Sequence, residues 1–96
     1  MNNLEMKLNM VKAGISILQT KTDKDTFINT SLEAAKIAIN DALNHTGVSK
    51  FFIEIARKIF DTIMAHPATT SEEYSNIFTL DNGLRSALKE LNDGAE

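Results

Sequence analysis

The residues best suited to acid–base or metal chemistry are two histidines, each with a carboxylate nearby in the sequence. Asp41 lies four residues before His45, and Asp61 lies five residues before His66. An Asp–His pair can activate a nucleophile, but a zinc site needs three or four converging ligands. Because each histidine stands where a helix is predicted to end, the preferred interpretation is a structural role at the negative end of a helix dipole.

Other reactive groups are scarce. The chain has no cysteine, which excludes thiol nucleophiles, thiolate zinc sites and disulfides. Its serines lack the Gly-x-Ser-x-Gly setting of a nucleophile, and its four glycines are too scattered to build a phosphate-binding loop. We therefore expect no enzymatic activity, no cofactor and no metal centre, and a function based on binding.

Composition narrows the class of partner. Ninety-six residues predict one domain over 1–96, and a net charge of −3 does not favour nucleic acid. The acidic excess lies late, because residues 49–96 carry eight acidic and five basic groups. No apolar run approaches the about 18 residues of a membrane span, and charged residues interrupt the first stretch, so we expect a soluble, cytoplasmic protein.

Four stretches place apolar residues at helical spacing, and together they predict an all-α bundle. Met6, Met10 and Ile17 are expected to widen the first stripe, and Gly14 predicts a close approach of another helix. Thr22 and Asp25 resemble a capping box that opens the second helix, and Gly47 is placed to close it in the left-handed conformation. The first two stripes are Leu4, Leu8, Val11, Ile15 and Leu18, then Ile28, Leu32, Ala35, Ile39 and Ala42 or Leu43.

The third helix is predicted to run from Val48 or Ser49 to about Ala65, because Pro67 disfavours helical angles at the residue before it. Phe51 and Ile53 fall off its apolar arc, so they either touch a second helix or form an exposed patch that could seal a homodimer. The arc itself consists of Phe52, Ile55, Ala56, Ile59, Phe60, Ile63 and Met64.

The fourth stretch opens near Ser71, where Thr70 and Glu73 form a predicted capping box. Its apolar pattern continues to Leu91, but Asp81, Asn82 and Gly83 are poor helix formers in its middle. Either one helix runs from about Ser71 to Asn92, or two shorter helices meet near Asp81. We favour the break, because Leu80 and Leu84 lie on different faces.

The candidate partner-binding site is on this last stretch. Tyrosine and arginine are the residue types that most often anchor protein interfaces. The site is predicted to comprise Tyr74, Phe78, Arg85 and Lys89.

Three segments resemble the small bacteriocin immunity proteins of the enterocin A and lactococcin A kind: the stretch from Ser31 to Ile39, the stretch from Val48 to Phe60, and Glu73-Tyr-Ser ahead of Leu84-Arg-Ser-Ala-Leu-Lys-Glu-Leu. The likeness covers roughly residues 25–92 and rests on helix order, loop placement and apolar spacing. It implies an antiparallel four-helix bundle in the bacterial cytosol. It also implies a protective action at the inner side of the bacteriocin's membrane receptor, the mannose phosphotransferase permease.

A second hypothesis is a small helical inhibitor or regulator from a phage or other mobile element, which binds one host protein through a helix face. Size, missing cysteines and the acidic late region suit it equally well. Neighbouring bacteriocin genes would favour the first hypothesis, and neighbouring phage genes the second.

Overall fold

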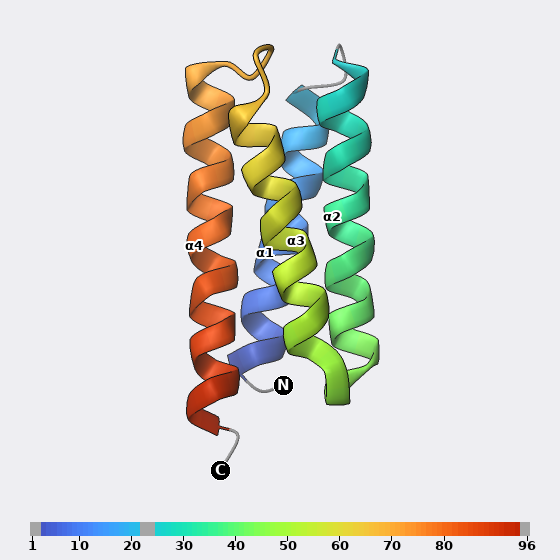
Figure 1. The fold of residues 1–96 in the computed structure, drawn as a ribbon, viewed down its shortest axis with the longest axis vertical. Helices are drawn as coiled ribbons and strands as arrows, with labels where there is room; N and C mark the ends of the chain where they lie inside the picture. The colour runs from blue at the N-terminus through green and yellow to red at the C-terminus, as the bar shows by residue number, and fades with distance from the viewer. Residues whose placement is uncertain (1–2, 22–24, 95–96) are drawn as a thin grey trace.

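The computed structural model describes residues 3–21 and 25–94, and these fold as a bundle of four α-helices (Figure 1). The helices are α1 (Asn3–Lys21), α2 (Thr26–Asn44), α3 (Ser49–Ala65) and α4 (Ser71–Gly94), with a short 3-10 turn, η1 (Thr46–Val48), between α2 and α3. Successive helices run in opposite directions (Figure 1). The all-α, antiparallel architecture is therefore confirmed.

Each helix packs against its neighbours in the sequence, and α4 closes the ring by packing on α1. The most extensive contact joins α2 to α3, and the least extensive of these four joins α1 to α2. In Figure 1, α3 lies in front of α1, with α4 on the left and α2 on the right, so α1 and α3 are diagonal partners. The Cα atoms span 43 × 20 × 19 Å, and the bundle is therefore a rod.

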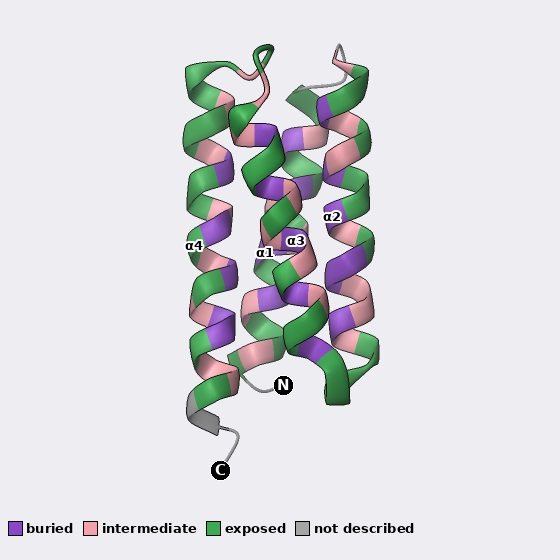
Figure 2. Cartoon of the chain, in the orientation of Figure 1, coloured by how far each residue is buried: buried purple, intermediate pink, exposed green. Residues whose placement is uncertain are grey.

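On α1 and α2 the buried residues come from the predicted stripes (Figure 2). On α1, the buried residues are Leu8, Val11, Ile15 and Leu18. On α2, alanines alternate with larger side chains, and these small residues let the α2 and α3 backbones approach closely. The buried set on α2 is Ile28, Leu32, Ala35, Ala38, Ile39 and Ala42.

The wider stripe predicted for α1 is wrong. Met6, Met10 and Ile17 are 46%, 68% and 59% exposed. All three lie off the buried stripe, and Met10 and Ile17 line shallow depressions together with residues of α4. Periodicity alone predicts positions for them that are too close to the core. The part of the α1 surface that a neighbouring helix covers depends on how the whole bundle is assembled, and helical spacing within α1 does not show it.

Both helix-boundary predictions for α2 need correction. Asp25 is the N-cap itself, since its Oδ1 accepts a hydrogen bond from the Ile28 amide at 2.9 Å; Thr22 lies outside the described residues. Gly47 does not adopt a left-handed conformation. The Ser49 hydroxyl donates to the Ala42 carbonyl at 2.6 Å and the His45 amide donates to the Asp41 carbonyl, so two of the carbonyls at the end of α2 are satisfied without it.

The α3 helix has the predicted bounds, but its inward face is rotated from the predicted arc. Ile53 is fully buried, together with Phe60, Ala56 and Ile63, whereas Phe51 is 61% exposed. The two residues that could have sealed a homodimer together are thus divided between the core and the surface. Phe52, Ile55, Ile59 and Met64 pack at the margin of the core.

The α3–α4 turn follows the sequence prediction. Glu73 and Thr70 form the capping box: the Glu73 amide donates to Thr70 Oγ1 at 3.1 Å, and the Thr70 amide donates to Glu73 Oε1 at 2.8 Å. His66 follows the last residue of α3 with an extended backbone, as expected before proline. These local signals were sufficient because no distant residue takes part in them.

The predicted break near Asp81 is wrong, because α4 is continuous from Ser71 to Gly94. Contacts from other helices offset the poor helix propensity there. The Asp81 carboxylate is buried against Arg57 of α3, and Gly83 lies against Val11 of α1. A Cβ atom added at Gly83 would stand 2.8 Å from Val11 Cγ2, and one added at Gly14 would meet Leu80. The predicted packing role of Gly14 is confirmed.

These two glycines are expected to respond differently to alanine, which normally stabilises a helix interior by about 1 kcal/mol. Gly83→Ala should destabilise the protein, because the buried, β-branched Val11 side chain has little freedom to move away. Gly14→Ala should be neutral or stabilising, since Leu80 is only partly buried and flexible. Urea unfolding of both variants tests this; equal stabilisation by both would contradict it.

Candidate functional site

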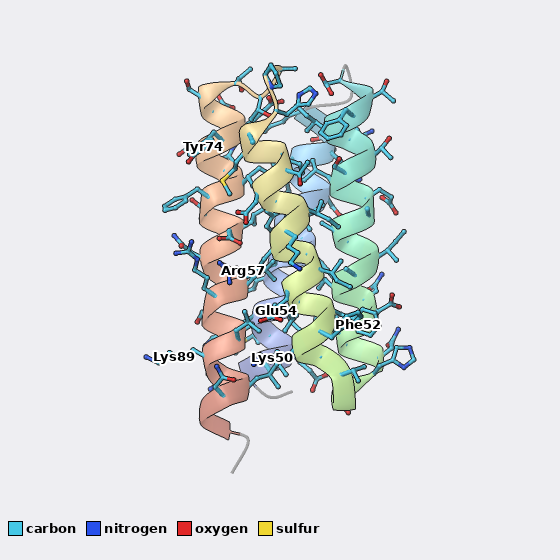
Figure 3. The ribbon with its side chains drawn as sticks, in the orientation of Figure 1. Lys50, Phe52, Glu54, Arg57, Tyr74 and Lys89 are labelled. Carbon is cyan, nitrogen blue, oxygen red and sulfur yellow. The ribbon has the colours of Figure 1, made fainter. Side chains whose placement is uncertain are left out.

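The four predicted binding residues form one exposed strip along α4. Because the helix is continuous, Tyr74, Phe78, Arg85 and Lys89 fall within about 60° of arc at ~100° per residue. We call these four residues the α4 strip. Tyr74 and Phe78 are 49% and 44% exposed, and both basic residues are exposed. Figure 3 shows Lys89 pointing away from the bundle on the outer side of α4.

A buried carboxylate lies directly behind the strip. Asp81 is 1% exposed and is approached by two arginines. Arg57 Nε donates to Asp81 Oδ1 at 3.2 Å, and Arg85 Nε lies 3.2 Å from Oδ2. The second contact is an ion pair without hydrogen-bond alignment, and Oδ2 has no other hydrogen-bond partner in the described part of the chain. Charge, rather than a fully satisfied hydrogen-bond network, holds Arg85 there.

Both arginines contact Asp81 through Nε, so the terminal amino groups of the two guanidinium ions are not used in these contacts. The Arg57 side chain is 30% exposed and the Arg85 side chain 55%. A guanidinium presents its remaining donors in a planar fork that matches a carboxylate. Asp81 thus orients the guanidinium groups of two arginines beside the aromatic residues of the strip.

The α3 side of the site is polar. Lys50, Glu54 and Arg57 lie on the side of α3 toward α4, whereas Phe52 lies toward α2 (Figure 3). One shallow depression is lined by Glu54, Arg57, Lys58 and Asp61. A second runs between the helices and is lined by Asp61, Met64, Ala65 and Tyr74, so the tyrosine borders a partly apolar notch.

The site predicted from the sequence does not include Arg57, and Asp81 is treated there as a poor helix former. A usable signal was present: an aspartate at a position where the apolar stripe of α4 faces inward requires a cationic partner. Which cation pairs with it depends on how α3 and α4 are aligned along the bundle, and that alignment is not visible in local spacing.

The two histidines do not form a site. His45 and His66 lie at opposite ends of α3. The His66 Nδ1 atom accepts from the Ala68 amide at 3.1 Å, and its ring stacks on Phe27 with a centroid separation of 4.3 Å. Within residues 3–21 and 25–94, no three His, Asp or Glu side chains are grouped to hold a metal ion. The His66 ring therefore has a structural role in the turn that follows α3.

Two carboxylates with shifted acidity lie away from the α4 strip. A hydrogen bond from Lys7, together with its charge, lowers the pKa of Glu90 and ties α1 to α4. A hydrogen bond from Gln19, aided by the charge of Lys36, lowers the pKa of Glu33 between α1 and α2. Both groups are exposed, so these contacts act mainly to set the alignment of neighbouring helices.

None of the described helices is long and apolar enough to cross a bilayer. The chain matches no protein-family model, no curated protein and no solved structure.

Proposed function

We propose that this protein is a non-enzymatic binding module that recognises a protein partner through the α4 strip. The observation that supports this most is the pairing of two exposed aromatic side chains with arginines oriented by a buried carboxylate. Aromatic and arginine side chains supply most of the binding energy at protein interfaces. A pre-oriented arginine also loses less conformational entropy when it binds.

The strip specifies the chemistry of the partner. Tyr74 and Phe78 need an apolar surface, and Arg85 and Lys89, about two to four helical turns further along, need carboxylates. A partner helix with an apolar end and an acidic end would satisfy both requirements when it lies along α4. The partner surface we propose is therefore amphipathic and acidic.

The resemblance to bacteriocin immunity proteins suggests one identity for that partner. In this proposal the protein acts in the bacterial cytosol and contacts the inner side of a bacteriocin receptor in the membrane. The four-helix architecture and the resemblance over residues 25–92 support it. The alternative is a phage or mobile-element inhibitor of a host protein, for which the same strip would serve.

Expression in a bacteriocin-sensitive strain separates these two identities. Under the immunity proposal, cells that carry the wild-type chain survive bacteriocin, and cells that carry the Tyr74→Ala/Phe78→Ala variant do not. Growth inhibition without bacteriocin, abolished by the same variant, would instead support the inhibitor. If neither effect is observed when the wild type and the variant are present at equal levels, both identities are contradicted.

The strip itself is tested by affinity purification with mass spectrometry, comparing wild type with Tyr74→Ala/Phe78→Ala. Truncating two interface anchors should weaken binding by about 30-fold or more, since a central anchor contributes about 2 kcal/mol or more. The matched control is Ile37→Ala, which removes a 54% exposed apolar side chain from α2. Recovery of the same partners by all three proteins would argue against the strip.

A further inference from the structure

A second exposed face lies on the other side of α4, about 120° of arc from the α4 strip. Its α1 half carries three large exposed apolar side chains, Met6, Met10 and Ile17. Its α4 half carries small residues, among them Thr79, Gly83 and Ser86. We call these six residues the α1–α4 face. Isolated exposed apolar residues are ordinary, but three on one helix edge form a patch of the kind that marks an interaction site.

The α4 half of this face forms a trough. Two shallow depressions run along the α1–α4 seam and share Thr79 and Leu80 in their linings. One also includes Met10, Gly83 and Ser86, and the other includes Ile17 and Asn76. Met10 therefore lies level with Gly83 and Ser86, and Ile17 lies level with Thr79. A ridge of large side chains on α1 borders a trough of small ones on α4.

Among the residues that the structure describes, the charged side chains of this region stand at its two ends. At one end Lys7 of α1 pairs with Glu90 of α4 at 3.0 Å. At the other end Lys21 lies level with Asn76, and Glu72 lies one turn before Asn76 on the same side of α4. At each end α1 thus carries the positive charge and α4 the negative one.

This distribution of charges and side-chain sizes is self-complementary when two copies of the chain are related by one particular two-fold axis. We propose that two copies of the chain pair through the α1–α4 face about a two-fold axis parallel to the bundle, so that α1 of each copy lies on α4 of the other. Lys7 then meets the second copy's Glu90, and Lys21 meets its Glu72. Met10 enters the second copy's trough beside Gly83 and Ser86, and Ile17 enters it beside Thr79.

The other face-to-face arrangement, with the axis perpendicular to the bundle, is disfavoured. It lays α1 against α1, so that Lys7 meets the second copy's Lys21 and Glu90 meets its Glu72. It also sets the ridge of Met10 and Ile17 against the same ridge. Like charges and opposed large side chains both weaken such a contact.

The size of the face predicts a dimer that depends on concentration. At ~1.5 Å per residue, α1 is about 28 Å long, and two helices side by side are about 20 Å wide. The α1–α4 face of each copy therefore has an area of about 600 Å². Specific interfaces begin at about 600 Å² per partner. Since the α4 strip remains uncovered, the dimer is independent of the proposed partner binding.

Sedimentation equilibrium over a wide range of protein concentrations tests the dimer. Wild type should show a monomer–dimer equilibrium, and Met10→Glu should raise the dissociation constant at least about tenfold, because a carboxylate would be buried in the trough. Ile37→Glu on α2 is the matched control and should leave the equilibrium unchanged. A wild type that stays monomeric, or a dimer that Met10→Glu leaves intact, would overturn the proposal.

Cysteine crosslinking tests the axis, since the chain has no cysteine of its own. A mixture of the single variants Met10→Cys and Ser86→Cys should form the mixed disulfide dimer on mild oxidation. A mixture of Met10→Cys and Ile17→Cys should not. Preferential crosslinking of positions 10 and 17 would contradict the parallel axis and establish the α1–α1 arrangement instead.

Discussion

Replacing Phe60 by alanine is expected to lower the free energy of unfolding by about 3–5 kcal/mol, the usual cost of truncating a buried aromatic residue. Phe60 is fully buried in the core, on the inward face of α3. A protein of this size has a total stability of about 5–15 kcal/mol. The variant should therefore lose a large share of its stability, as measured by urea denaturation followed by circular dichroism.

Phe51 supplies the matched control, because it is the same residue type on the same helix but is 61% exposed. Phe51→Ala should change the free energy of unfolding by no more than about 0.5 kcal/mol. Equal losses from the two substitutions would show that α3 is rotated about its axis relative to the structure described.

The second large effect concerns the carboxylate of Asp81. The double variant Arg57→Met/Arg85→Met leaves this buried charge without a cation and should cost about 3–5 kcal/mol. Each single variant should cost less than half of the double loss, because the remaining arginine still pairs with Asp81. Urea denaturation gives these values, and Lys58→Met, which removes a neighbouring exposed charge, should have little effect.

A third substitution separates loss of charge pairing from loss of packing. Adding Asp81→Leu to the double variant removes the unpaired carboxylate, and apolar replacement of a whole buried ion cluster is often neutral or stabilising. The triple variant should therefore recover most of the lost stability. If it remains as unstable as the double variant, the arginines contribute by packing and the electrostatic interpretation is wrong.

The parts of the fold that could be predicted from the sequence are those decided locally. The capping box of Thr70 and Glu73 and the effect of Pro67 both act within one helical turn, and both were read correctly. The failures depended on other helices. Gly83 was read as a weak point because its propensity is poor, whereas in the bundle it makes room for Val11.

The candidate site shows the same division. Residue type and spacing were enough to select Tyr74, Phe78, Arg85 and Lys89, but a break at Asp81 would have put the two aromatic and the two basic residues on separate helices. Continuity of α4 aligns all four, and an ion pair joins Asp81 in the middle of this helix to Arg57 of a different helix. Spacing within one helix carries no information about that pair.

The most direct test of the central claim is photo-crosslinking from single positions in living cells that express the chain. A photoreactive amino acid at position 78, in the α4 strip, should give a discrete crosslinked product with a protein partner. The same amino acid at position 37, on α2, should not. No product from position 78, or the same product from both positions, would contradict recognition through the α4 strip.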